Sequence, residues 1–589
     1  MANIAKLLTE HMAIWTAADT EKKSGRGRAS GNAGNVYGVK KLRELILELA
    51  VRGKLVPQDP NDEPANELLK RIQAERAKLI AEGKLKKEKP LAPIGEDEKS
   101  FELPKGWEWV RVSNLAEIKG GKRLPEGKTF SPVKTSNIYI QVTNMKHGTV
   151  IEESLKYIDD ETKEILKNYT ISSEDLYITI AGTIGDVGTV PENFNGMILT
   201  ENAAKIVFNI LDKNWFKHCF SSNFLREQFQ EKTIQLAQPK LALHRVASSV
   251  IALPPLDEQH RIVAKVDELM ALCDQLEQQH STAQEAHETL VSQLLATLTQ
   301  SQNAAEFNAN WQRIYAHFDV LFTTEASIDA LKQTLLQLAV MGKLVPQDPN
   351  DEPASELLKR IQAEKAKLIA EGKLKKEKPL APIDEDEKQF KLPKGWEWIS
   401  IQEVTMVITD GTHHTPNYID SGVPFISVKD INGKTISFDD CKYISEKEHQ
   451  EINARCNPEV DDILLCRIGT LGRPTIVDTN IAFSLFVSVG LLKLPKTVKI
   501  QNYLHRVLSS PMMYEQYDKI KAGGSHTNKL NLGEIPKLLI PLPPISEQHR
   551  IVAKVDALMA LCDQLKTRIQ KANQQQQAIA DALVGQAVE

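Results

Sequence analysis

The sequence contains few cysteines, no long apolar run and almost no net charge. Six cysteines in 589 residues are too few for a disulfide scaffold, and their spacing does not match the paired C-x-x-C ligands of a zinc site. No run of 18 apolar residues occurs, which argues against a transmembrane helix. The N-terminus lacks the apolar core and cleavage site of a signal peptide. We therefore expect a reducing, cytoplasmic location.

The net charge excludes one class of nucleic-acid binder. Lys and Arg number 73 against 78 Asp and Glu, which leaves a formal charge of −5. A globally basic, histone-like protein is excluded by this balance. A local basic groove is not, because binding footprints depend on how charge is distributed rather than on its sum.

Signatures of common enzymes are also missing. There is no GxGxxG after a strand, no GxSxG, no HExxH, no methyltransferase Asn/Asp-Pro-Pro-aromatic tetrapeptide and no nuclease carboxylate cluster. GKRLPEGKT at 121–129 resembles a phosphate-binding loop, but its glycines are one residue too far apart. His413 and His414 have no cysteine or carboxylate at metal-ligand spacing, so we expect a loop pair. These absences predict a recognition or scaffold protein.

The dominant feature is an internal repeat with an offset of 289 residues. Residues 50–110 match 339–399 at 54 of 61 positions, and residues 253–276 match 542–565 at 21 of 24. We call these four segments the repeated frame. Between them lie two segments of 142 residues, 111–252 and 400–541, in which only short phrases align. We call these the first and second divergent domains.

This pattern carries a functional argument. A frame that is kept so closely indicates that both copies meet the same kind of partner or pack against each other. Divergent domains indicate that the two copies see different ligands. Recent duplication followed by drift is the alternative, but drift alone would also have blurred the frame.

Hydrophobic periodicity predicts helices in the frame and strands in the divergent domains. We expect a short helix in 1–18, a basic flexible loop at 19–38, and exposed tethers, with Lys84, Lys86, Lys87 and Lys89, whose lysines are solvated rather than bound to phosphate. The expected frame helices are 39–52, 328–341, Pro64–Gly83 and Pro353–Gly372. Strands spaced by Gly, Pro and Asn should fill the divergent domains, with helices near 213–232 and 498–521.

A long helix should follow each divergent domain. Apolar positions alternate by four and three over roughly five heptads, which predicts a coiled-coil seam. In the first helix the seam is Ile262, Val266, Leu269, Cys273, Leu276, His280, Ala283, His287, Leu290 and Leu294, and in the second it is Ile551, Val555, Leu558, Cys562, Leu565, Ile569, Ala572, Gln576, Ile579 and Leu583. Two such helices in one chain most simply pair antiparallel, with a pseudo-two-fold axis, and the glutamines at 574–577 lie on the polar face.

The predicted fold is therefore α+β, with two mixed, strand-rich domains separated by a pair of long antiparallel coiled-coil helices. The expected segments are 1–110 (N-terminal helices and tether), 111–252 (first divergent domain), 253–399 (central frame with long helix and second tether), 400–541 (second divergent domain) and 542–589 (C-terminal long helix).

These motifs, in this order, resemble the specificity (S) subunit of type I restriction–modification enzymes. LPKGWEW at 103–109 and 392–398 opens each domain, GTIG at 182–185 and GTLG at 469–472 lie inside, and LPPLDEQHRIV and LPPISEQHRIV close them. DGTHHTP at 410–416 begins the second domain where the first has GGKRLPEG, so equal contacts are not assumed. The duplicated GKLVPQDPNDEPA block indicates the IB subfamily.

The resemblance implies a non-catalytic DNA-recognition subunit. Each divergent domain is then a target-recognition domain that reads one half of a bipartite asymmetric target in double-stranded DNA. The long helices bind two modification (methyltransferase) subunits, restriction (ATP-dependent translocase/nuclease) subunits join them, and together they direct adenine methylation or restriction. S-adenosylmethionine, Mg²⁺ and ATP belong to those partners, with no cofactor or metal in this chain and no membrane association.

Polar loop residues of the types that contact phosphates and base edges are the candidate DNA-binding residues. In the first domain they are Lys119, Lys122, Arg123, Asn144, Lys146, His147, Gln238, Lys240 and Arg245. In the second they are Thr412, His413, His414, Lys429, Asn432, Arg467, Arg473, Ser525, His526, Asn528 and Lys529. Lys240 and Lys529 are equivalent at the offset and are expected on phosphates, whereas Arg467 and His526 are expected to read bases.

Two other functions stay open at this point. One is a coiled-coil scaffold that joins two different protein partners, and the other is an enzyme with an unfamiliar active site. Each divergent domain is nearly neutral, with 17 basic and 16 acidic residues in the first and 15 and 16 in the second. DNA binding therefore needs a concentrated basic face and help from partner subunits.

Overall fold

The computed structural model describes residues 11–17, 36–85, 91–231, 240–302, 304–522 and 528–588. Most of the helix predicted in 1–18 and of the loop predicted at 19–38 lies outside these ranges, as do Lys86, Lys87 and Lys89. The chain divides into two compact units, each described by itself. Unit 1 is Met1–Ala283 with Ala572–Glu589, and unit 2 is Gln284–Lys571.

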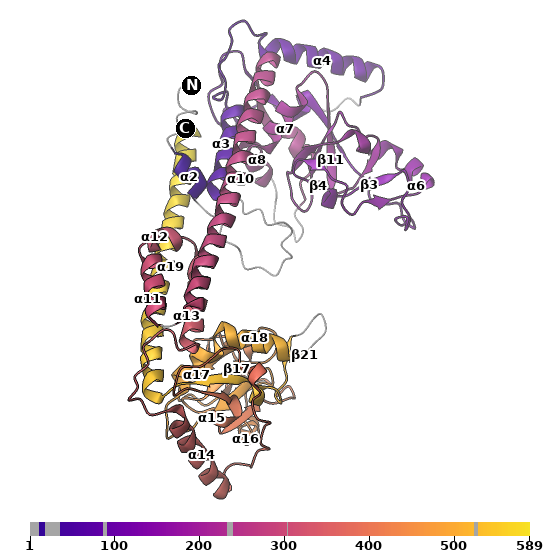
Figure 1. Ribbon diagram of the computed structural model, residues 1–589. Coiled ribbons are helices and arrows are strands. Elements are labelled where there is room, and N and C mark those ends of the chain that lie inside the picture. Colours follow the sequence, from indigo (N-terminus) through magenta and orange to yellow (C-terminus); the bar gives the residue numbers. More distant parts are fainter. Residues whose placement is uncertain are drawn as a thin grey trace. The chain divides into compact units, whose positions relative to one another are not determined.

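Outside the divergent domains the chain forms the helices that its periodicity predicts (Figure 1). They are α2 (Met12–Ala17), α3 (Tyr37–Val51), α4 (Ala65–Ala81), α10 (Leu256–Gln300), α13 (Glu325–Val340), α14 (Ala354–Ala370) and α19 (Ile545–Val588). Two further helices, α11 (Ala304–Tyr315) and α12 (Phe318–Leu321), were not predicted. Pro64 and Pro353 are the N-cap residues of α4 and α14, whereas each was expected to be the first helical residue. Gly83 and Gly372, each at φ +71°, end them as predicted.

The repeated frame fastens each divergent domain to the start of a long helix. In unit 1 the side chains of Gln58 and Trp107 both donate to the buried carboxylate of Glu258, at 3.0 and 2.9 Å. In unit 2 the carboxylate of Glu547 accepts from the equivalent glutamine and tryptophan at the same distances. The same three residues of the frame are thus held by one hydrogen-bond network in each unit.

The first divergent domain contains two main sheets and a strand pair. The strands are β1 (Glu108–Arg111), β2 (Ala116–Gly120), β3 (Ile138–Ile140), β4 (Met145–Lys146), β5 (Thr149–Val150), β6 (Lys156–Tyr157), β7 (Thr170–Ile171), β8 (Leu176–Thr179), β9 (Val187–Thr189), β10 (Met197–Leu199), β11 (Ala203–Phe208) and β12 (Val250–Leu253). Their orders are β2-β11-β8-β9-β5-β4, β6-β3-β10-β7 and β1-β12. The helices are α5 (Val112–Leu115), α6 (Asp160–Ile165), α7 (Lys213–Ser221), α8 (Asn223–Glu231) and α9 (Leu243–Ser248).

The second divergent domain repeats this plan. Its strands are β13 (Glu397–Ser400), β14 (Val407–Asp410), β15 (Val423–Ile426), β16 (Lys442–Ile444), β17 (Ile463–Cys466), β18 (Gly472–Ile476), β19 (Ser484–Leu485), β20 (Val489–Lys493), β21 (Lys521–Ala522), β22 (Lys529–Leu530) and β23 (Leu539–Leu542). Their orders are β14-β20-β17-β18, β16-β15-β19, β13-β23 and β21-β22. The helices are α15 (Ile401–Val404), α16 (Glu446–Asn453), α17 (Gln501–Leu508) and α18 (Pro511–Ile520).

The two domains therefore share one topology although their sequences differ. The order β2-β11-β8-β9 matches β14-β20-β17-β18, and the parallel pair β3–β10 matches β15–β19. The strand-rich prediction is confirmed. The helices expected near 213–232 and 498–521 are each broken into two, at Ser222 and at Ser509–Ser510.

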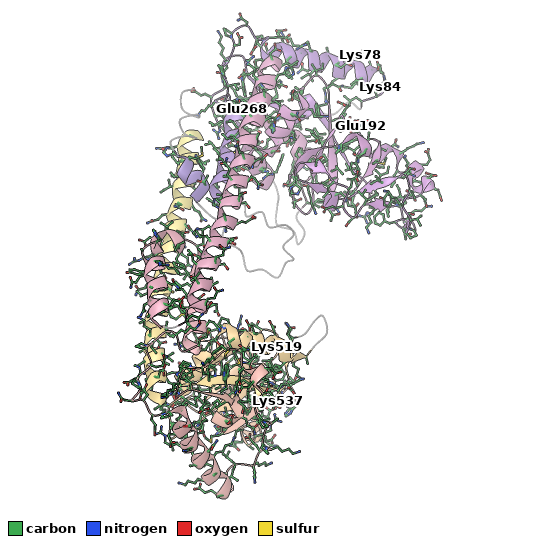
Figure 2. The ribbon with its side chains drawn as sticks, in the orientation of Figure 1. Lys78, Lys84, Glu192, Glu268, Lys519 and Lys537 are labelled. Atoms are coloured by element: carbon green, nitrogen blue, oxygen red, sulfur yellow. The ribbon has the colours of Figure 1, made fainter. Side chains whose placement is uncertain are left out.

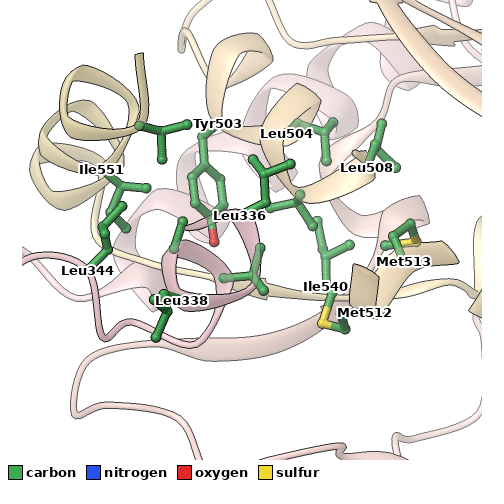
Figure 3. Packing of buried hydrophobic residues seen from close by; sticks show 14 of the residues in the cluster. Leu336, Leu338, Leu344, Tyr503, Leu504, Leu508, Met512, Met513, Ile540 and Ile551 are labelled. Atoms are coloured by element: carbon green, nitrogen blue, oxygen red, sulfur yellow. The ribbon is translucent and has the colours of Figure 1, made fainter. Parts of the chain in front are cut away.

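One hydrophobic core in each unit joins the divergent domain to the frame. Figure 3 shows this core in unit 2, where side chains from α13, α17, α18, β23 and α19 meet. The residues labelled there are Leu336, Leu338, Leu344, Tyr503, Leu504, Leu508, Met512, Met513, Ile540 and Ile551. Because frame and domain share one core, the domain is anchored rigidly to the helices of its own unit.

The long helices need one correction to the predicted seam. α10 has 45 residues and α19 has 44, but Leu290 and Ile579 are 48% and 46% exposed. The buried or half-buried positions shift by one residue, so that Val291 and Ala580 are buried instead. The inward positions step by four twice in succession, over 276–280–284 in α10 and 565–569–573 in α19. The buried stripe of a strict heptad pattern drifts about 20° per heptad around a straight helix. An extra four-residue step moves the stripe back toward the same face of the helix.

Short helices supply much of the packing that was expected between the long ones. In unit 1 the side chain of Arg43 in α3 bonds Asp274 of α10 at 2.6 Å, and Lys41 of α3 lies 3.3 Å from Asp581 of α19. The same hydrophobic cluster holds the first half of α10 and the last residues of α19. In unit 2 Lys332 of α13 pairs with Asp563 of α19. Each unit thus holds the beginning of one long helix and the end of the other, as antiparallel helices require.

Candidate nucleic-acid interface

In each divergent domain, four loops meet beside one end of the main sheet. We call each group a loop cluster. The first loop cluster comprises 121–123, 181–185, 200–202 and Lys240, and the second comprises 411–414, 468–472, 486–488 and 528–529. The members are far apart in sequence and are joined by backbone hydrogen bonds.

The GTIG and GTLG motifs form the same turn in both clusters. Their glycines have φ between +81° and +89°, a region that other L-residues rarely adopt. An isolated bridge joins Ala181 to Lys240, and another joins Ile468 to Lys529. Because both bridges occupy the same place beside the turn, the structural equivalence of Lys240 and Lys529 is confirmed.

The first loop of each cluster also begins identically. The backbone of Gly121 lies against Thr200, and that of Gly411 lies against Leu485. A Cβ atom at these glycines would stand 2.1 Å from the carbonyl oxygen of Thr200 and 1.9 Å from that of Leu485, so only glycine fits. The first loops of the two clusters therefore begin with the same backbone contact and differ in the side chains that follow it.

In the first cluster a buried tyrosine holds two loops together. The hydroxyl of Tyr139 lies 2.7 Å from the carbonyl oxygen of Lys122 and 3.0 Å from the carboxylate of Glu201. Burial raises the pKa of Tyr139 to about 12, so the hydroxyl keeps its proton and donates it. The Lys240 ammonium donates to the carbonyl oxygen of Glu201 at 3.0 Å. Lys122, Arg123 and Lys240 are exposed, and together they form a basic group at this end.

The second cluster is built around the buried carboxylate of Asp410. The side chain of Asp410 is fully buried and pairs with the guanidinium groups of Arg455 and Arg467. The Nε2 of His413 lies 3.1 Å from the same carboxylate. Arg467 also donates to the carbonyl oxygens of Val487 and Leu530, both at 3.2 Å. One carboxylate thus ties all four loops of this cluster together.

Among the described residues, the equivalent positions of the first domain lack this network. Gly120 precedes Gly121 where Asp410 precedes Gly411, and Ile180 stands where Arg467 stands. The last equivalence follows from the backbone, because the N–H of Leu241 donates to Ile180 and that of Leu530 donates to Arg467, both at 2.8 Å. The same scaffold therefore carries different chemistry in the two domains.

Two candidates need correction because their side chains are buried, and the side chain of a third is engaged in a turn. Asn144 is fully buried, accepts from the Gln141 N–H and donates to the Glu153 carbonyl oxygen. Arg467 is 3% exposed and is held by the contacts above, so it does not present free donors to bases. Asn432 is exposed, but its side-chain oxygen accepts from the backbone of the turn that it begins. Sequence types alone could not separate these roles.

The remaining candidates are spread over other surfaces or lie outside the described residues. Those elsewhere in the domains are Lys119 in β2, Lys146 and His147 in the β4–β5 turn, Arg245 in α9, Lys429 beside Asp430, and Arg473 at the start of β18. Gln238, Ser525 and His526 lie outside the described residues. The candidates that the clusters bring together are Lys122, Arg123, Lys240, Thr412, His413, His414, Arg467, Asn528 and Lys529.

Sequence reasoning missed Arg455 and Tyr139. Arg455 is half-exposed and follows α16, 45 residues from Asp410 in sequence, and no local pattern signals this pairing. Within the described ranges, no group of three or more His, Cys, Asp or Glu residues is placed to hold a metal ion. In the same ranges no helix is long and apolar enough to cross a membrane.

Comparison with known proteins gives consistent matches. A family profile described as type I restriction modification DNA specificity domain matches residues 104–284 and 393–574. The type I restriction enzyme EcoAI specificity subunit of Escherichia coli is 40% identical over the whole of both chains. The EcoEI specificity subunit of Escherichia coli is 40% identical over 99% of this chain and 100% of that one. The solved HsdS subunit from Thermoanaerobacter tengcongensis is 19% identical over 83% of this chain and 98% of that chain, with a TM-score of 0.38.

Proposed function

Since the chain belongs to the family of type I restriction–modification specificity subunits, we propose that it recognises a bipartite DNA target without catalysing a reaction itself. Each divergent domain reads one half of an asymmetric site. The long helices hold two modification subunits, and restriction subunits join that complex. Adenine methylation and cleavage, with S-adenosylmethionine, Mg²⁺ and ATP, then belong to the partners, in the cytoplasm.

The proposal rests on the observation that the two divergent domains share one scaffold but present different side chains on it. Both domains share a topology and a loop cluster, and both are fastened by the same frame. Their clusters differ at the positions that present side chains. Two readers of different half-sites need this combination, because phosphate contacts set the register while side chains on loops discriminate bases.

The exposed cluster residues support contact with DNA. Lys122, Arg123 and Lys240 in the first cluster offer cationic donors, and Lys529 does so in the second, where His413 is also exposed. Since each domain is almost neutral overall, these residues concentrate positive charge locally. We propose that the lysines bind phosphates, and that Arg123, His413 and His414 contact base edges.

A domain exchange tests the proposal. Residues 111–252 are replaced by the matching domain of another such subunit, and the methylome of a host that carries the complete system is sequenced. One half of the target should change while the other half is kept. A target that changes in both halves, or in neither, contradicts independent reading.

The alternative is a scaffold that joins two different proteins. Retention of a random DNA library by the purified complex separates the two, because a scaffold enriches no sequence. Purified chain alone should transfer no methyl group, and methyl transfer by it would contradict a non-catalytic role.

A further inference from the structure

The two divergent domains differ at the buried position with which each of them begins. Arg111 in unit 1 is replaced by Ser400 at the 289-residue offset. Arg111 is 8% exposed. Its guanidinium donates to both carboxylate oxygens of Glu98 at 2.8 and 2.9 Å and to the carbonyl oxygens of Ala92 and Ser248 at 3.0 and 2.8 Å. A further bond at 3.3 Å reaches the carbonyl oxygen of Pro93.

In unit 2 the corresponding place is a cavity of about 950 Å³. Every equivalent of the residues that hold Arg111 lines it: Ala381, Pro382, Glu387 and Lys537, together with Ser400 itself. Lys537 is labelled in Figure 2. The hydroxyl of Ser400 donates to Glu403 at 3.0 Å, so the short side chain does not reach across the cavity.

The carboxylate of Glu387 is already oriented as Glu98 is. In unit 1 the N–H of Gly95 donates to Glu98 at 3.0 Å, and in unit 2 the N–H of Asp384 donates to Glu387 at 3.0 Å. Within the ranges that the structure describes, no lysine or arginine side chain pairs with Glu387. A carboxylate in this pose accepts a guanidinium through two parallel hydrogen bonds.

The cations that line the cavity are engaged elsewhere. Lys365 lies 2.6 Å from Glu377, Lys388 lies 2.5 Å from Glu385, and Lys537 lies 2.9 Å from Glu534. The walls are completed by apolar side chains, among them Leu380, Leu392 and Trp398. Such walls favour the planar, weakly hydrated guanidinium over an ammonium ion.

We propose that this cavity in unit 2 is a binding site for a guanidinium group. Unit 1 shows how a guanidinium group is held there, because Arg111 fills the equivalent place. The inference does not depend on DNA recognition.

Calorimetric titration of the full chain with methylguanidinium tests this, with tetramethylammonium as the ionic control. One saturable site per chain is expected for methylguanidinium and none for the control. Ser400→Arg should fill the cavity and weaken binding at least tenfold, and Glu387→Gln should do the same. Both variants should melt no lower than about the wild-type midpoint, since Glu387 is exposed and the new arginine repeats contacts made in unit 1.

Arg111→Ser is the matched variant, because it opens the equivalent place in unit 1. The stoichiometry should rise from one to two, and methylguanidinium should raise the melting midpoint of this variant more than that of the wild type. Absence of saturable binding to the wild type, or binding that Ser400→Arg and Glu387→Gln leave unchanged, overturns the proposal.

The source of the group is tested with two ligands. N-acetyl-arginine methylamide mimics an arginine residue within a protein, and free L-arginine mimics a metabolite. Tighter binding of the amide identifies an arginine residue of a protein as the source. Equal or tighter binding of free L-arginine identifies a small molecule, and binding of neither ligand overturns the proposal.

Discussion

The indole Nε1 of Trp107 donates a 2.9 Å hydrogen bond to Glu258, a residue 151 positions later in the chain. Trp396 makes the same bond to Glu547 in the other unit. Both carboxylates are buried, and burial raises the pKa of Glu258 and of Glu547. These bonds tie the residue before the first strand of each divergent domain to the first turn of a long helix.

Glu258→Gln should destabilise unit 1. A glutamine offers one acceptor oxygen, whereas Trp107 and Gln58 both donate to Glu258, so one donor loses its acceptor. The loss should be about 1–3 kcal/mol, measured by urea unfolding. Glu268→Gln is the control, since Glu268 is an exposed residue of the same helix (Figure 2), and should stay within about 0.5 kcal/mol of the wild type. Equal stability of the two variants contradicts the role given to Glu258.

Asp410→Asn should be among the most destabilising single changes in the second divergent domain. It leaves the buried guanidinium of Arg467 without its counter-charge, which costs about 3–5 kcal/mol when one partner of a buried pair is removed. Asp420→Asn, an exposed change in the same domain, is the control. Thermal and urea unfolding measure both.

A second substitution separates charge from shape. Arg467→Ile in the Asp410→Asn background imitates the first domain, where Ile180 occupies the equivalent position. It should recover at least half of the lost stability, because no buried charge is left unpaired. A double variant that is less stable than Asp410→Asn contradicts the ion pair as the cause.

Lys240→Ala and Lys529→Ala should weaken binding to all DNA sequences alike. If each ammonium neutralises one phosphate, the slope of log affinity against log salt falls by ~1. His413→Ala should instead relax one base-pair position, at a cost of ~1–3 kcal/mol. Binding of the complete complex to matched and single-mismatch duplexes at several salt concentrations measures this. Altered preference at a single base pair in Lys529→Ala contradicts the phosphate assignment.

Unit 1 should lose stability as the pH falls below neutrality because of His218. Burial lowers the pKa of His218 to about 4, and its Nε2 lies 3.5 Å from Asp267. A base with a depressed pKa in the folded state contributes stability above its unfolded pKa, near 6.5, and loses it down to the folded pKa.

Relative to His218→Phe, the wild type should therefore lose up to about 1.4 kcal/mol per pH unit below pH 6.5. Urea unfolding at pH 7.5, 6.0 and 5.0 measures the difference. His244→Gln, an exposed change in the same unit, should keep the wild-type profile. A pH profile that is parallel in the wild type and His218→Phe excludes His218 as the titrating group.

Much of the architecture is encoded locally. The structure contains the amphipathic helices and the strand-rich domains, which are encoded by patterns among neighbouring residues. It also contains the repeat, which is visible when the sequence is compared with itself at an offset of 289. The glycines of GTIG and GTLG were visible as motifs because their positive φ excludes other residues. Even the equivalence of Lys240 and Lys529 followed from counting positions.

Burial and pairing, in contrast, were decided by contacts between distant segments. Arg467 and Asn144 have the residue types of DNA readers, yet Arg467 is enclosed by Asp410 and by loops from two other parts of the chain. After 280 and 569 the buried positions of the long helices differ from the predicted seam, and Val291 lies in one hydrophobic cluster with residues of α13.

The sequence by itself determined that one unit occurs twice, where most of its long helices lie and that its two domains diverge, since these properties can be read from the order of the residues. Only the tertiary structure decided which polar side chains remain free to meet a ligand. It also showed that a guanidinium fills one copy of a site while the other copy is open, because desolvation and hydrogen bonding are settled by whatever the fold brings alongside.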